Sequence, residues 1–170
     1  MIIDGKPPQV VGIRSAVARD LPAIRRLVNV AYAEFEPWLT PANWTQMTSN
    51  IAKVIEPGAP GQLLVAQLGD QLAGTITYLP PGPKDYRRVP PQWAVIRALA
   101  VDPELRGRGV GRALTEHCLA RARADHAPAV GLHTAEMMVA ARALYEHAGF
   151  VHQHDFTHLD LRFSIYALQI

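Results

Sequence analysis

RGRGVG, residues 106–111, lies between an apolar run that ends at Val101 and an amphipathic stretch that opens at Ala113. Three glycines alternate with bulkier residues where a strand gives way to a helix. A glycine-rich turn into a helix exposes backbone N–H groups at the positive end of the helix dipole, and a bulky anion can approach them closely. A tight connection alone would explain one glycine and leave two unexplained. The stretch therefore indicates a cradle for a phosphate or pyrophosphate group.

Two common phosphate-binding loops do not fit this spacing. A P-loop requires Gly-Lys-Ser/Thr, which the chain lacks. A dinucleotide fingerprint requires G-x-G-x-x-G and an acidic residue at the end of the next strand. Here Gly107, Gly109 and Gly111 are spaced G-x-G-x-G, and the run 130–134 contains no acidic residue. The phosphate ligand therefore belongs to another class.

Length and composition favour one soluble domain. A chain of 170 residues can bury a substantial core, and we expect a single domain over 1–170 with its core at about 10–170. The net charge of +2 does not favour a nucleic-acid partner. No apolar run is long enough for a membrane span, the N-terminal residues do not resemble a signal peptide, and the single cysteine, Cys118, is typical of a reducing compartment. We expect a cytoplasmic protein with no membrane partner.

Periodicity and turn residues predict an α/β domain whose sheet mixes hairpins with crossovers. The predicted strands are 10–14, 61–67, 71–79, 93–101, 130–134 and 161–170. Asp20 is expected to cap a helix that carries Leu21 to Ala31 at helical spacing, and further helices are predicted at 44–55, 110–124 and 137–148. The five prolines of residues 80–91 predict a stiff loop.

Two motifs resemble a known family. Arg106, Gly109 and Gly111 match the Q/R-x-x-G-x-G/A signature of the GNAT superfamily of acyl-CoA-dependent N-acetyltransferases. ALYEHAGF, residues 143–150, resembles the later L-Y-x-x-x-G-F motif of that family. The predicted order of elements agrees, so the resemblance extends over nearly the whole chain. It implies the GNAT fold, a mixed and mostly antiparallel central sheet with a splayed strand pair, flanked by helices.

The resemblance also implies acetyl-CoA as co-substrate and no metal. The strand before the glycine loop would pair with the pantetheine arm, and the N–H groups of the loop would hold the pyrophosphate. The expected acetyl-CoA residues are Leu99, Ala100, Val101, Arg106, Gly107, Arg108, Gly109, Val110, Gly111 and Arg112.

Amide formation from a thioester requires a neutral amine, a polarised carbonyl and a stabilised leaving thiolate. By resemblance, the general acid for the thiolate is Tyr145 and the backbone N–H of Leu99 polarises the carbonyl. Tyr145 shares a helical stripe with apolar residues, so a tyrosine of the core with a satisfied hydroxyl is the alternative.

The amine base does not carry over from the family. Many relatives have a glutamate on the central strand where Val95 stands, and many have an asparagine where Met138 stands. The candidates are Glu136, a histidine, or solvent alone.

The acceptor pocket is expected between two connections. Residues 34–38 combine acids with aromatic residues, and Glu34, Phe35 and Trp38 are the candidates there. The loop 80–91 offers Tyr86 on the other side. The favoured acceptor is a primary amine of a small molecule. A protein N-terminus or lysine is the second choice, and an acyl-CoA-binding sensor module without chemistry is the rival. A homodimer is compatible with the resemblance.

The histidine-rich segment 152–158 has a spacing that zinc could use, since His152 and His154 would point the same way on a strand. No cysteine supports such a site, and direct acetyl transfer needs no metal. We favour a polar, partly exposed loop, with a histidine near the acceptor as the second interpretation and a metal site as the last. Cys118 is expected to pack in the core.

Overall fold

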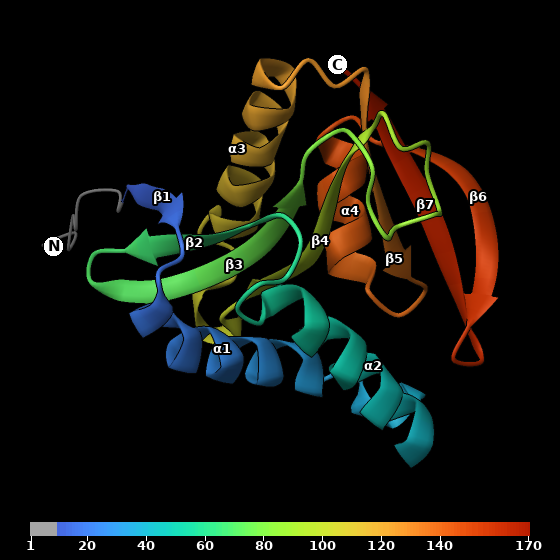
Figure 1. Ribbon diagram of the computed structural model, residues 1–170. Coiled ribbons are helices and arrows are strands. Elements are labelled where there is room, and N and C mark those ends of the chain that lie inside the picture. Colours follow the sequence, from blue (N-terminus) through green and yellow to red (C-terminus); the bar gives the residue numbers. More distant parts are fainter. Residues whose placement is uncertain (1–9) are drawn as a thin grey trace, which may run out of the picture.

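A computed structural model describes residues 10–170 of the chain, which form one seven-stranded sheet in the order β1-β2-β3-β4-β5-β7-β6. β4 and β5 are parallel, and every other neighbouring pair is antiparallel (Figure 1). The strands are β1 Val11–Ser15, β2 Gln62–Leu68, β3 Gln71–Leu79, β4 Ala94–Val101, β5 Ala129–Ala135, β6 Val151–His158 and β7 Leu161–Gln169. This architecture confirms the predicted fold class.

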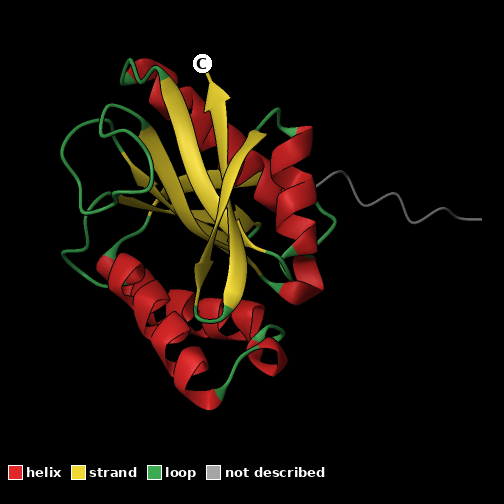
Figure 2. Cartoon of the chain, turned by 90° about the vertical axis from the view of Figure 1, so that its right-hand side faces the viewer, coloured by secondary structure: helices red, strands yellow, loops and turns green. Residues whose placement is uncertain are grey.

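In residues 10–170, four α-helices cover the two faces of the sheet, so that the strands lie between two groups of helices (Figure 2). α1 Leu21–Ala33 and α2 Pro41–Ile55 lie on one face, whereas α3 Val110–Ala124 and α4 Val139–His147 lie on the other. Short 3-10 helices occupy Ala18–Asp20, Glu36–Trp38 and Pro103–Leu105. Within residues 10–170, no helix combines the length and apolar character required to cross a membrane.

The central strands are buried on both faces because helices cover both. In β2, Leu64 contributes to the core on the α3 side, while the next residue, Val65, packs with Ile24 of α1 on the other side. Side chains of successive strand residues point to opposite faces, so both must be apolar here. Leu114 of α3 is fully buried in the first of these cores, and such burial contributes about 2 kcal/mol.

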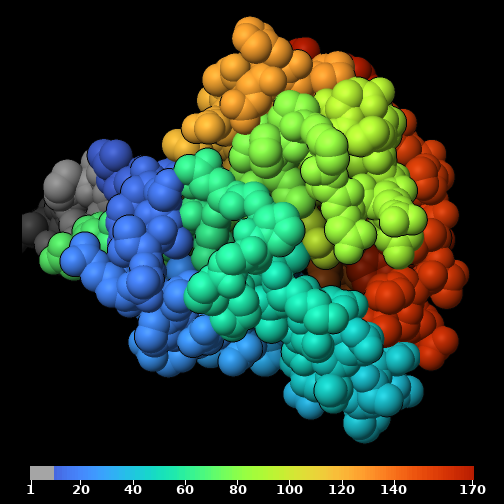
Figure 3. Space-filling model, in the orientation of Figure 1, coloured from blue at the N-terminus to red at the C-terminus, as the bar shows by residue number. Residues whose placement is uncertain are grey.

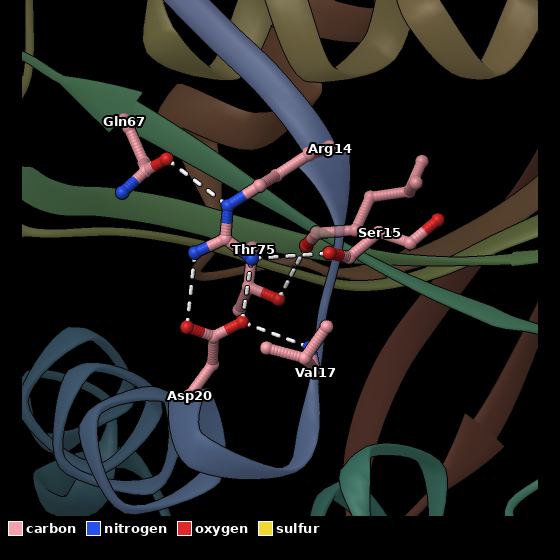
Figure 4. Close-up of polar contacts among 7 residues, drawn as sticks. Arg14, Ser15, Val17, Asp20, Gln67 and Thr75 are labelled. Carbon is pink, nitrogen blue, oxygen red and sulfur yellow. Dashed lines mark hydrogen bonds and ion pairs between the residues drawn. The ribbon is translucent and has the colours of Figure 1, made fainter.

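Asp20 does not cap α1 through its side chain, contrary to the sequence-based expectation. Its carboxylate accepts hydrogen bonds from Arg14 Nη1 at 2.6 Å and Nη2 at 2.9 Å, and from the Val17 backbone N–H at 2.8 Å (Figure 4). The Arg14 guanidinium is a charged donor, so the Asp20 carboxylate binds it in preference to the backbone N–H groups at the start of α1. These bonds, that of Arg14 foremost, lower the pKa of Asp20 to about 2.

The second helix begins at Pro41, three residues earlier than expected. The Thr40 hydroxyl accepts the N–H of Asn43 at 3.3 Å, and Pro41 occupies the first turn. Proline has no N–H to lose there and its fixed φ suits a helix, so this proline starts the helix instead of breaking it.

β6 was missed by the sequence analysis, which assigned residues 152–158 to a loop. The segment is an edge strand that pairs only with β7, and most of it is exposed. With little apolar surface to bury, the strand shows no alternation of apolar and polar residues. Polar side chains on an edge strand also discourage pairing with other chains.

Candidate active site

The sheet opens between its two parallel strands. β4 pairs with β5 only at Ala94↔Val130 and Val95↔Gly131. From Ile96 to the end of β4 no residue pairs with β5, so one edge of the strand is free. This gap is the splay that the resemblance implied.

A β-bulge in β4 accompanies the splay. Thr75 pairs with Ala100 and Thr77 with Arg97, so Ala98 and Leu99 together oppose one residue of β3. Ala98 has a φ of 52°, in the left-handed region that disfavours side chains other than hydrogen. A bulge bends its strand and redirects side chains. In this chain it lies at the opening of the sheet.

The glycine loop follows β4 and leads into α3. Gly107 and Gly109 have φ values of 75° and 79°, and a Cβ atom on Gly111 would lie 3.2 Å from Leu144 Cδ2 of α4. The three glycines therefore have conformational and packing reasons to be present, which corrects the argument that two of them had no structural explanation.

The loop still presents the donors of an anion cradle. None of the backbone N–H groups from 106 to 112 donates a hydrogen bond to a residue that the structure describes. They lie at the N-terminus of a 15-residue helix, where the dipole favours negative charge.

A first cavity, of about 590 Å³, runs along this loop, and we call it the glycine-loop cavity. It lies between the free edge of β4, the loop and α4. All of the expected acetyl-CoA residues line it except Arg108. Two lining arginines are neutralised: Arg106 contacts Glu34 at 2.6 Å, and Arg112 contacts Glu116 at 2.7 Å.

Tyr145 of α4 also lines the glycine-loop cavity. Its ring packs edge-on against Phe150, and its hydroxyl makes no hydrogen bond with any residue between 10 and 170. Burial raises the pKa of Tyr145 because a phenolate would lose its hydration. The hydroxyl therefore keeps its proton at physiological pH and remains a free donor in the cavity.

A second cavity, of about 610 Å³, opens between α2, the loop 80–91 and the β6–β7 hairpin, where Figure 3 shows a hollow. We call it the arginine cavity, after Arg87, Arg88 and Arg97 in its lining. Its loop wall is fixed by Lys84, whose Nζ donates to the carbonyls of Gly82, Pro91 and Trp93 at 2.7–2.9 Å.

The two cavities meet at the gap between β4 and β5. Six residues line both of them: Tyr32, Arg97, Ala98, His133, Thr134 and Met138. Thr134 Oγ1 is buried and has no hydrogen-bond partner among residues 10–170, and the Tyr32 hydroxyl donates to the Leu99 carbonyl at 3.1 Å. A molecule in one cavity can therefore reach a molecule in the other at this junction.

His133 is a neutral side chain of the junction. Its Nδ1 lies 2.6 Å from the Tyr86 hydroxyl, and the two rings are stacked. Burial foremost, and then the charges of Arg97 and Arg88, lower the pKa of His133 to about 3. A histidine with this pKa is a weak base toward an ammonium group.

The residues expected around the acceptor are divided between the cavities. Tyr86 lines the arginine cavity, whereas Glu34 and Phe35 line the glycine-loop cavity. Trp38 lines neither cavity and is 59% exposed. Arg106 of the glycine loop donates to the Glu34 carboxylate and to the carbonyl of Ala31. These contacts hold the start of the connection after α1 against the glycine loop.

Neither of the two positions considered for a base faces the junction. Glu136 lines neither cavity; its carboxylate accepts the Arg162 backbone N–H at 3.2 Å. Val95 is fully buried in a core cluster with Leu79 and Ile165. Two residues of β4 line both cavities, Ala98 and Arg97, and the Arg97 guanidinium is a cation that cannot accept a proton.

The histidines of β6 do not converge. His152 contacts Asp155 at 2.7 Å, while His158 lines the arginine cavity. Between residues 10 and 170, no group of three or more His, Cys, Asp or Glu side chains is placed to hold a metal ion. Cys118 is buried on the inner face of α3, and burial raises its thiol pKa to about 12.

Sequence reasoning did not single out Arg97, His133 or Thr134. Arg97 interrupts the apolar run of β4, and His133 interrupts that of β5. Such polar residues inside otherwise buried strands are the signal that could have identified them, because burial of a polar group is costly without a purpose or a partner.

Comparisons with known proteins agree with this geometry. The model of the acetyltransferase (GNAT) family matches residues 21–150. A mycothiol acetyltransferase of Beutenbergia cavernae is 49% identical over 55 residues, which are 32% of this chain and 18% of that protein. The match thus spans less than a fifth of that relative.

Solved structures share the fold at low sequence identity. A GNAT-family protein of Desulfovibrio desulfuricans has a TM-score of 0.70 at 21% identity, over 94% of this chain and 99% of the other. The ribosomal-protein-S18-alanine N-acetyltransferase of Escherichia coli has a TM-score of 0.67 at 24% identity, over 95% and 94%. The yncA protein of Salmonella typhimurium, solved with its cofactor acetyl-CoA, has a TM-score of 0.66 at 18% identity, over 94% and 93%.

Proposed function

The chain belongs to the acetyltransferase (GNAT) family, and from that premise we propose that it transfers the acetyl group of acetyl-CoA directly to a primary amine of a small molecule. The observation that carries this proposal is the meeting of two cavities at the gap between β4 and β5. One cavity offers a row of free N–H donors for a pyrophosphate, and the other offers room for an acceptor.

The acetyl-CoA side of the proposal rests on backbone groups. The pyrophosphate would accept hydrogen bonds from the N–H groups of 106–112, and the pantetheine arm would pair with the free edge of β4 at Leu99 and Val101. This arrangement leads the thioester toward the junction and Tyr145. Glycine at 107 and 109 permits the backbone conformation that presents these donors.

Transfer forms a C–N bond and breaks a C–S bond. The amine nitrogen attacks the thioester carbonyl carbon, the amine loses one proton, and the departing thiolate requires one. We assign the Leu99 N–H to the carbonyl oxygen, where negative charge develops. We assign Tyr145 to the sulfur, since its protonated hydroxyl has no partner in the described chain.

The proton of the amine is assigned to solvent. Of the residues that the structure describes, two carboxylates line the cavities, Asp85 and Glu34. Neither lies at the junction, and Glu34 is bound to Arg106. His133, at the junction, has a pKa lowered to about 3. We therefore propose that the acceptor reacts as the fraction of amine that is already neutral.

A screen of thiol release tests this function. The purified protein is incubated with acetyl-CoA and amino acids, polyamines, arylalkylamines or peptides, and products are identified by mass spectrometry. We expect one N-acetylated product per thiol released with a small amine. Turnover with peptides alone would instead support a peptide acetyltransferase, and tight binding of acetyl-CoA without turnover would support a sensor module.

A further inference from the structure

The arginine cavity carries an excess of positive charge. Its lining includes three arginines, Arg87, Arg88 and Arg97, against one carboxylate, Asp85. Many of the other residues that line this cavity are apolar, Met47 among them. A cavity for a simple alkylammonium ion would be expected to carry the opposite sign, because like charges repel.

Arg97 is the arginine nearest to the chemistry, because it lines both cavities at their junction. Its guanidinium carbon lies 5.2 Å from the centre of the Tyr86 ring. It makes no hydrogen bond or ion pair with any residue between 10 and 170, unlike Arg106 and Arg112 in the neighbouring cavity. A partly buried guanidinium with unused donors is a binding group for an anion.

The other two arginines are carried by a fixed loop. Lys84 binds three backbone carbonyls of that segment, and the Tyr86 hydroxyl contacts His133 of β5. The guanidinium carbon of Arg88 lies 3.6 Å from the centre of the Phe156 ring, which holds this exposed side chain beside the cavity. The positive charge is therefore built into the wall of the cavity.

On the basis of the proposed acetyl transfer, we propose that the acceptor is an amine that also bears a carboxylate, and that Arg97 binds this carboxylate. The planar guanidinium matches the two carboxylate oxygens in a bidentate geometry. Since Arg97 lies at the junction, the carboxylate and the reacting amine must be close together in the acceptor, as in an amino acid. Arg88 adds attraction for the anion from the outer part of the cavity.

Matched substrates test this assignment. Common L-amino acids, their carboxamides and the corresponding decarboxylated amines are compared by kcat/KM, each divided by its fraction of neutral amine. We expect a preference for the carboxylate of at least about tenfold, the value of one charge-assisted contact. An equal or better kcat/KM for the uncharged compounds would overturn the inference and leave acetyl transfer intact.

Variants separate recognition from structure. In Arg97→Gln the preference for the carboxylate, which is the ratio of kcat/KM for the amino acid to that for its carboxamide, should fall to within about threefold, because the charge contact is lost. Arg97→Lys should retain part of the preference. Arg26→Gln, which removes an exposed arginine on α1, is the matched control and should leave the preference unchanged. An unchanged preference in Arg97→Gln would show that Arg97 does not bind the carboxylate.

A binding measurement needs neither turnover nor a variant. Calorimetry on the CoA-loaded wild type compares an N-acetyl amino acid with its N-acetyl carboxamide, and the acid should bind at least about tenfold more tightly. Equal affinities would contradict the inference. If the acid binds more tightly but no amine in the screen is acetylated, the acetyl-transfer proposal is contradicted and the assignment of a carboxylate to Arg97 is not.

Discussion

The two cavities are built by different means. The glycine-loop cavity is lined by one long segment, β4 with the loop after it, and by α4, the connection after α1 and part of β5. The arginine cavity consists of side chains from α2, the loop 80–91, β4, β5 and the β6–β7 hairpin. In the proposed function, backbone donors would bind the invariant part of acetyl-CoA, whereas side chains from separate elements would set the choice of acceptor. The proposal therefore assigns binding of the acetyl donor and selection of the acceptor to different cavities.

Removal of one hydroxyl in the glycine-loop cavity should have the largest effect. Tyr145→Phe keeps the ring against Phe150 but deletes the donor to the leaving sulfur, so kcat should fall by roughly 10²–10⁴. The affinity for acetyl-CoA, measured by calorimetry, should change little. Wild-type turnover in this variant would show that the thiolate is protonated by another group.

The pH dependence of kcat/KM tests whether a side chain at the junction of the two cavities acts as a base toward the amine. With an acceptor of pKa near 10 and no enzymic base, kcat/KM should rise about tenfold per pH unit from pH 7 to about pH 9. His133, with a pKa lowered to about 3, does not titrate in this range. A less basic α-amine should give a flatter profile.

Glu136→Gln is the control for this series and should leave the profile unchanged. A plateau near neutral pH in the wild type that Glu136→Gln loses would identify Glu136 as the base and would contradict the assignment to solvent.

Blocking the backbone donors should affect one cavity alone. In Gly109→Val the positive φ of 79° and the added side chain disfavour the loop conformation, so affinity for acetyl-CoA should fall by tenfold or more, since a charge-assisted contact contributes about 1.5–3 kcal/mol. Gly69→Val is the matched control, because Gly69 also has a positive φ but lies in the distant β2–β3 turn with open space around it. Calorimetry on both folded variants should show the loss only in Gly109→Val; equal affinities would refute the cradle.

The smallest effect is expected at the Arg14–Asp20 ion pair, which contributes to the stability of the fold and lines neither cavity. Asp20→Asn should lower the free energy of unfolding by about 1–2 kcal/mol at pH 7, because the pKa of Asp20 is lowered to about 2 by Arg14 foremost. A lowered pKa stabilises the fold above the unfolded value near 4, and this contribution is lost as the pH falls toward 2. The difference between Asp20→Asn and the wild type, measured by urea unfolding, should therefore vanish near pH 2, with turnover at pH 7 unchanged. A difference that persists at pH 2 would exclude the ion pair as its cause.

The contrast between the cavities also explains what the sequence could predict. The glycine loop, Tyr145 and the expected acetyl-CoA residues belong to two motifs that each occupy one short stretch of sequence, so the resemblance to the GNAT family was sufficient to predict them. The arginine cavity joins segments between residues 32 and 163, and its composition depends on the packing of α2 and the β6–β7 hairpin. Local patterns carry no information on that packing.

Three local features could not be predicted from the sequence for other reasons. The bulge at Ala98 uses an alanine in a conformation that usually selects glycine, so residue identity gave no signal. β6 is an exposed edge strand, so burial imposed no period on its residues. Asp20 occupies the N-cap position of α1 as predicted, but its side chain does not cap the helix, because its partner Arg14 comes from a preceding strand and competes with the helix N-terminus.

The anchoring of Lys84 has a consequence for the way in which an acceptor is admitted. Its three contacts to backbone carbonyls make the proline-rich segment preorganised, so binding need not expend free energy on ordering a disordered lid. A preorganised wall also adapts little. Acceptor analogues that enlarge the side chain toward residues 85–88 should therefore be rejected by steric exclusion, rather than accommodated by induced fit, and the range of accepted amines should be narrow.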